Sequence, residues 1–177
     1  MNQNASETKL TQTPQGVAPE GEGWFIVNIA DARGRSSERF GRAVRFEGEP
    51  EFQAFGINVR ILQPGQPNCL YHRESQTEAF LVLEGECVAI VEEQERPMRK
   101  GDFLYAPPGT AHVFVGAGEE PCAILMVGTR IQPEELLYPV SEVAGRHGAA
   151  VESVTDSAQE AYAGSPPPGP AQLQLPW

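Results

Sequence analysis

The sequence predicts an all-β domain whose antiparallel strands form a sandwich or a barrel. Short apolar segments recur at regular spacing through the middle of the chain, and each is bounded by Gly, Pro or charged residues. The 18 glycines and 16 prolines suggest many turns between these segments. No helical pattern separates the segments, so the crossover helices that a parallel sheet needs are missing from the middle of the chain.

Seven segments are expected to be strands. The clearest is residues 52–62, where Phe55 and Ile57 alternate with Asn58 and Arg60 on opposite faces. Which face lines the interior stays open, because a slip of one residue in register exchanges the two faces. The other expected strands are residues 24–30, 79–85, 86–93, 96–106, 111–117 and 122–129.

The two ends of the chain differ from this β-rich middle. Residues 1–21 are polar and lack periodicity, which predicts a disordered arm. Residues 151–177 form a Pro/Gly-rich tail that could lie extended against the domain. The anchors of that tail would be Leu173, Leu175 and Trp177.

The domain itself is expected at residues 22–150, with one or two short helices near its C-terminal end. The first candidate helix is residues 132–138, where Pro133 precedes two glutamates. The second is residues 141–148, which Ser141 would cap.

Composition excludes several classes of partner. The net charge of −11 would repel nucleic acid and an anionic membrane surface. No apolar run approaches the ~20 residues of a membrane helix, and the first residues do not resemble a secretory signal. Three cysteines at unrelated spacings predict reduced thiols in a cytoplasmic protein: Cys69, Cys87 and Cys122.

Two segments place metal-ligating residue types together. His72, Glu74 and Glu78 share strand parity, so extended structure would put all three on one face. His112 follows a Pro-Pro-Gly turn in a second segment. Two imidazoles with carboxylates are ligands that divalent metals favour. Cys69, of opposite parity, should point away from such a site.

These segments resemble the two motifs of the cupin superfamily. The first motif reads GQPNCLYHRESQTEAFLVLEG over residues 65–85, and the second reads GDFLYAPPGTAH over residues 101–112. The resemblance implies an antiparallel jelly-roll barrel that holds a divalent metal through His72, Glu78 and His112. Where the common pattern has a second histidine, this chain has Glu74. Glu74 could therefore be a fourth ligand, could bond a metal-bound water, or could pair with Arg60 or Arg73.

The resemblance leaves the metal open among Fe(II), Mn(II) and Zn(II). It implies a metal-dependent oxidoreductase, dioxygenase-like, that acts on a small organic substrate. The alternatives are a sugar isomerase or epimerase and a non-catalytic cupin that binds a metal or small ligand. If Asn58 and Arg60 face inward, the cavity suits a carboxylate substrate. If the apolar face of the same strand, Phe55, Ile57, Val59 and Ile61, is the inner one, the cavity suits an aromatic ring. A homodimer is also expected, because cupin-like barrels commonly pair their sheets.

Overall fold

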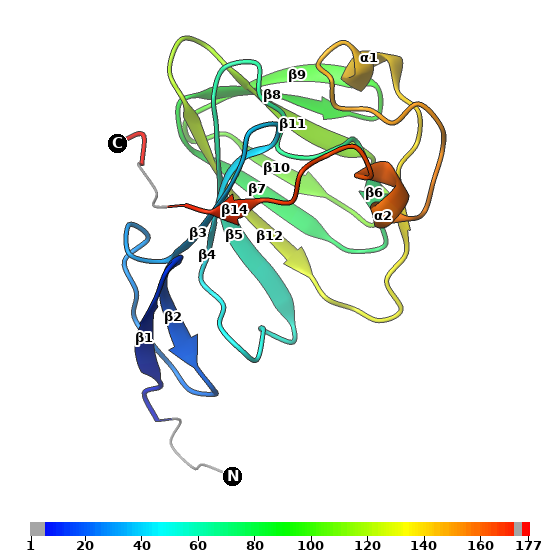
Figure 1. Cartoon of the computed structure of the whole chain (residues 1–177). Coiled ribbons are helices and arrows are strands. Elements are labelled where there is room, and N and C mark those ends of the chain that lie inside the picture. The colour runs from blue at the N-terminus through cyan, green and yellow to red at the C-terminus, as the bar shows by residue number, and fades with distance from the viewer. Residues whose placement is uncertain (1–5, 172–174) are drawn as a thin grey trace.

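Two antiparallel sheets pack around a common core and form a jelly-roll barrel, which confirms the predicted all-β fold (Figure 1). The computed structural model describes residues 6–171 and 175–177. The larger sheet has the strand order β10-β7-β12-β5-β4-β3-β14, and the smaller has the order β11-β8-β9.

The strands of the larger sheet are β3 (Arg33–Ser37), β4 (Gly41–Arg45), β5 (Phe55–Leu62), β7 (Glu78–Glu84), β10 (Phe103–Ala106), β12 (Cys122–Thr129) and β14 (Gly169–Pro170). Those of the smaller sheet are β8 (Glu86–Val91), β9 (Gln94–Arg99) and β11 (His112–Ala117). Every pairing within both sheets is antiparallel, and most neighbouring strands, such as β5 and β12, are far apart in the sequence.

The core lies between the two sheets. Phe80 and Val82 of β7 pack there with Phe114 of β11 and Met98 of β9. The rings of Phe80 and Phe114 are 4.6 Å apart between centroids, and both side chains are almost fully buried. Buried apolar area of this kind is the main source of stability. Glu78, Phe80 and Val82 of β7 face the interior, as their shared parity predicts.

The structure settles which face of β5 is the inner one. Asn58 and Arg60 line an interior cavity, whereas Val59 and Ile61 pack in a separate apolar cluster. Residues of the 24–30 segment and Leu175 cover that second cluster. The sheet is therefore buried on both faces near β5, and its inner face carries polar side chains.

The N-terminal predictions are wrong in two places. Residues expected to be a disordered arm form a hairpin of β1 (Lys9–Thr13) and β2 (Gly16–Glu20). The turn is held locally, since Thr13 Oγ1 donates to the Gly16 carbonyl over 2.6 Å. Residues 24–30 form no strand; Trp24 alone makes an isolated bridge. Val27 and Ile29 of this segment instead pack on the outside of the sheet without pairing to it as a strand.

At the C-terminal end, the prediction of a helix at residues 132–138 is wrong. Its last residues form β13 (Leu136–Leu137), which pairs with β6 (Arg73–Glu74). This tertiary pairing overrides the local helical signal. Helix α1 (Glu142–Gly145) is confirmed, because Ser141 Oγ accepts a hydrogen bond from Ala144 N.

The tail contributes more structure than its composition suggests. It contains helix α2 (Ala158–Ala161) and the edge strand β14, which pairs with β3. Of the three expected anchors, Leu175 packs against the outer cluster, Trp177 is exposed, and Leu173 lies outside the described residues. No helix among the described residues is long and apolar enough to span a membrane.

Candidate metal centre

Two backbone hydrogen bonds bring the two motif histidines together. His112 N donates to the His72 carbonyl over 2.8 Å, and His72 N donates back to the His112 carbonyl over 3.3 Å. Their ring centroids are consequently only 5.1 Å apart. The turn before His112 also fixes the neighbouring strand, because Gly109 N donates to the Glu74 carbonyl over 2.8 Å. Gly109 has φ +83°, a conformation that favours glycine.

Each imidazole is oriented by a carbonyl on its outer side. His72 Nδ1 lies 2.9 Å from the Leu70 carbonyl, and His112 Nδ1 lies 3.0 Å from the Thr110 carbonyl. A carbonyl only accepts, so both Nδ1 atoms carry a proton, and a ring that gives up its Nε2 proton has its lone pair directed to the interior. Such backbone partners commonly fix the tautomer of metal-ligating histidines.

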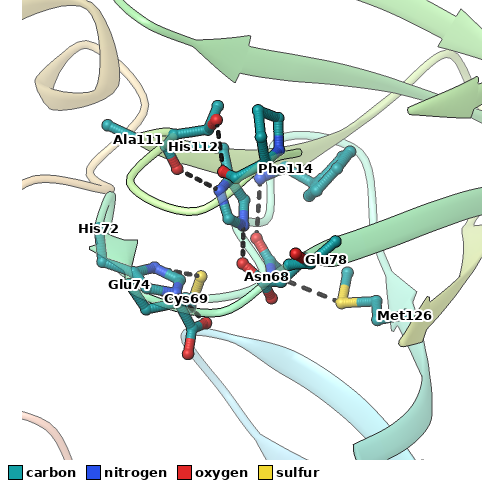
Figure 2. Close-up of polar contacts among 12 residues, drawn as sticks. Asn68, Cys69, His72, Glu74, Glu78, Ala111, His112, Phe114 and Met126 are labelled. Atoms are coloured by element: carbon teal, nitrogen blue, oxygen red, sulfur yellow. Dashed lines mark hydrogen bonds and ion pairs between the residues drawn. The ribbon is translucent and has the colours of Figure 1, made fainter. Parts of the chain in front are cut away.

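Glu78 completes a group of three ligand atoms that lie within 4.8 Å of one another. Its Oε2 is 3.2 Å from His112 Nε2, and Figure 2 shows the two side chains pointing toward each other. The His112 side chain is 2% exposed, and those of Glu78 and His72 are each 15% exposed. The structure thus brings together three of the four residues that the sequence proposes as ligands.

Glu74 lies beside this group. Its Oε1 is 3.5 Å from His72 Nε2, and its side chain is 17% exposed. The hydrogen bond from His72 lowers the pKa of Glu74, so this carboxyl is ionised at neutral pH. The structure therefore places Glu74 where it faces His72, and it forms no ion pair with Arg60 or Arg73 among the described residues.

The electrostatics of the group suit a divalent cation. Burial, together with the charge of Glu74, raises the pKa of Glu78 to about 8. Burial, together with the charge of His72, lowers the pKa of His112 to about 4. Without a metal, a proton on Glu78 can bond the Nε2 lone pair of His112, which removes the repulsion between two acceptors. A cation at the same position would satisfy both lone pairs instead.

The ligand atoms open into an interior cavity of about 360 Å³. Phe80 and Met126 contribute apolar lining, while Asn58, Arg60 and Tyr138 contribute polar groups. The cavity is therefore neither plugged nor purely apolar.

Sequence reasoning missed several lining residues. Cys69 was expected to point away, but its Sγ lies 3.6 Å from His72 Nδ1 and it lines the cavity. Parity fails there because no strand is assigned between Leu62 and Arg73. Asn68 holds this loop to β11, since Phe114 N donates to its Oδ1 over 2.8 Å (Figure 2). Tyr138 and Tyr162 come from the C-terminal region, where no motif pointed to them.

Comparison with known proteins agrees with this geometry. A family model described as a cupin domain matches residues 58–128, which include all four candidate ligands. A search of curated protein sequences gave no match.

Solved structures share the barrel. The chain is 27% identical to a cupin-superfamily sugar phosphate isomerase from Silicibacter pomeroyi, over 63% of this chain and 80% of that chain, with a TM-score of 0.56. It is 18% identical to the polyketide cyclase RemF from Streptomyces resistomycificus, over 62% and 82%, with a TM-score of 0.54. It is 20% identical to a predicted oxalate decarboxylase from Thermotoga maritima, over 60% and 100%, with a TM-score of 0.54.

The barrel with two facing histidine segments therefore defines a cupin fold. Together with the family match over residues 58–128, it supports the assignment of this chain to the cupin superfamily.

Proposed function

We propose that the protein is a metal-dependent cupin enzyme that acts on a small organic substrate in its barrel cavity. The convergence of His72, Glu78 and His112 within 4.8 Å, beside a cavity, is the observation that carries this proposal. These three residues would hold Fe(II), Mn(II) or Zn(II), and Glu74 is the proposed fourth ligand. Two imidazoles and carboxylates suit all three ions.

The first candidate reaction is an oxidation of the dioxygenase type. When bound, a redox-active ion would supply Lewis acidity and electrons for O₂ chemistry. The chain's own contribution is to orient both imidazoles through Leu70 and Thr110 and to shield the centre with Phe80, whose ring lies 5.0 Å from that of His112. This reaction requires that Glu74 leave room at the metal for the substrate.

The second candidate is proton transfer within a sugar-like substrate, as in an isomerase. Two observations favour it: the 27% identity to a sugar phosphate isomerase and the presence of a second carboxylate in the site. Glu74 is ionised, so its carboxylate has the lone pairs to accept a proton from a substrate carbon or hydroxyl, and its lowered pKa makes it a weak base. In this reaction Glu78 stays with the metal and Glu74 moves the proton.

A non-catalytic binding protein is the remaining alternative. Such a protein would be expected to have a closed four-ligand site inside a plugged barrel. The cavity of about 360 Å³ next to the ligand atoms instead supports access for a substrate.

The two reactions can be separated by experiment. Fe(II) is added to the protein without oxygen, nitric oxide is added as an O₂ surrogate, and electron paramagnetic resonance is recorded. A Fe–NO signal that is altered when a substrate is added supports the dioxygenase-type reaction. Bound Fe(II) without that signal, together with solvent deuterium appearing in a sugar phosphate by NMR, supports the isomerase class. If metal binds but neither the Fe–NO signal nor the deuterium incorporation is observed, the result supports the binding protein.

The His147→Ala variant is the matched control for these tests. His147 lies on the surface in an ion pair with Glu95 at 2.9 Å. Its loss removes one imidazole without touching the proposed ligands, so it should leave both signals unchanged. His112→Ala should abolish them.

We also propose that the protein is a homodimer in the cytoplasm. Exposed aromatic and aliphatic side chains offer material for an interface: Trp24, Ile26, Phe103, Tyr105 and Trp177. The three cysteines form no disulfide. The negative net charge supports the exclusion of nucleic acid and anionic membranes as partners. Light scattering after size exclusion would contradict the dimer if it gave about 19.2 kDa at micromolar concentration.

A further inference from the structure

A second cavity adjoins the metal centre. Its volume is about 220 Å³, and it lies between strands β3 to β5 and the C-terminal residues Pro166–Pro168. Arg60 and three neighbours, Asn68, Cys69 and Tyr162, line this cavity and the metal cavity alike. Arg60 therefore lies at the boundary between the two spaces.

The second cavity is basic although the protein is acidic. Arg35, Arg45 and Arg60 line it, and no Asp or Glu does so in the described part of the chain. The sheet register explains the grouping: Arg35 lies opposite Ala43, and Ala43 lies opposite Arg60, so their side chains share one face. Three cations gathered in one hollow of a protein with net charge −11 indicate an anionic ligand.

Arg60 has no acidic partner in the part of the chain that the structure describes. Its Nε is buried without a hydrogen-bond partner, and none of the ion pairs among the described residues includes it. The Oδ1 atom of Asn58, on the same inner face of β5, is also buried without a partner. A buried guanidinium N–H without a partner is costly, so its presence beside another unsatisfied polar atom indicates that a ligand supplies the missing bonds.

The chemistry of a guanidinium narrows the ligand. Its planar donors match two oxygens of a carboxylate or phosphate group in parallel hydrogen bonds. Asn58 lies two residues before Arg60 on β5, and Gly56 lies two residues further along the same strand. Gly56 pairs with Gly128 of β12, and Gly128 pairs in turn with Glu78 of β7. A molecule bound at Arg60 thus has a continuous polar path along β5 to the metal centre.

We propose that the substrate carries an oxyanion, a carboxylate or phosphate group, which Arg60 binds with support from Arg45. The rest of the substrate extends past Asn58 to His72, Glu78 and His112. The placement of that second end rests on the proposed function, whereas anion binding at Arg60 does not require the metal.

Titration calorimetry on metal-free protein tests the anion site alone. Inorganic phosphate and malonate are titrated separately at fixed ionic strength into wild type, Arg60→Met, Arg60→Lys and Arg99→Met. Arg99 is the matched control, because it is an exposed arginine on β9 in the other sheet. Wild type and Arg99→Met should bind one anion per chain, and Arg60→Met should bind it at least about tenfold more weakly.

The preferred anion identifies the substrate's charged group as phosphate or carboxylate. Equal affinity in wild type and Arg60→Met would overturn the proposal, as would the absence of binding of either anion to wild type. Thermal melts check that each variant is folded, and Arg60→Lys, which keeps the charge, should recover part of the affinity.

A separate Mn(II) titration keeps the two proposals apart. Arg60→Met should bind the metal as wild type does. Anion binding without metal binding would contradict the proposed function and leave the anion site standing. Metal binding without anion binding would contradict the anion site and leave the proposed function standing.

Discussion

The Nε2 atom of His112 lies 3.2 Å from Oε2 of Glu78, while the Nδ1 atom of the same ring lies 3.0 Å from the Thr110 carbonyl. The ring is thus held between a backbone acceptor and a carboxylate that comes from the other sheet. Because the side chain is 2% exposed, water cannot take the place of either partner. This pairing links the second motif to the first and defines the interior end of the proposed metal centre.

Replacing Glu74 should show whether this carboxylate contributes to metal binding. In Glu74→Gln the side chain keeps its size but loses the charge that faces His72 at 3.5 Å. If it only orients His72, metal affinity should fall by about 10- to 100-fold with one ion still bound per chain. Competition with a fluorescent chelator measures this. Unchanged affinity would mean that Glu74 neither ligates nor orients.

Metal affinity should rise with pH up to about 8. A ligand must be deprotonated to bind, and the pKa of Glu78 is raised to about 8 by burial and by Glu74. Below that pH the metal displaces a proton from Glu78, so Mn(II) binding should release a proton. Calorimetry in two buffers of different ionisation enthalpy counts that proton. In Glu78→Gln the proton from Glu78 should no longer be released and most of the affinity should be lost; any release that remains comes from His72, whose pKa is also raised.

Metal-free protein should lose stability as pH rises from about 6.5 to 8. Burial and Glu74 raise the folded-state pKa of Glu78, so folded protein holds a proton in this range that unfolded protein has already lost. His72 changes stability in the same direction: burial opposes its charge, but Cys69 and the bond to Glu74 outweigh that and raise its pKa. The lowered pKa of His112 acts only below this window. Urea midpoints at several pH values test the slope, which should be smaller in Glu78→Gln.

Arg60→Met should make the metal-free protein more stable by about 1 kcal/mol, because it removes a buried Nε–H that has no hydrogen-bond partner. Thermal melts with and without phosphate measure the effect. Phosphate should raise the melting temperature of wild type and leave that of the variant unchanged. A variant less stable than wild type would mean that Arg60 supports the fold itself.

The sequence predicts the barrel and the proximity of His72, Glu78 and His112, for a physical reason. Side chains alternate between the two faces of β7, so Glu78 lies on the same inner face as Phe80 and Val82. The turn before His112 is short, so local sequence patterns determine where these side chains point. Whether Arg60 faces inward could not be predicted, because that depends on how β5 pairs with β4 and β12.

Two of the missed features, the Leu136–Leu137 strand and the position of Cys69, depend on contacts between distant residues, whereas the N-terminal hairpin is held by a local turn. The Leu136–Leu137 strand forms only because Arg73–Glu74 is available to pair with it. Cys69 reaches His72 because the loop before His72 bends, held by the bonds of Asn68 to Phe114. The hairpin over residues 9–20 depends on turn bonds of Thr13 that its polar composition conceals.

Titration of Mn(II) into metal-free protein, for wild type, His112→Ala and His147→Ala, tests the central claim most directly. The proposed centre predicts one ion per chain in wild type and in His147→Ala, and at least about 100-fold weaker binding in His112→Ala, because a ligand is lost. Equal stoichiometry and affinity in all three proteins would place any metal elsewhere and would contradict the proposed centre.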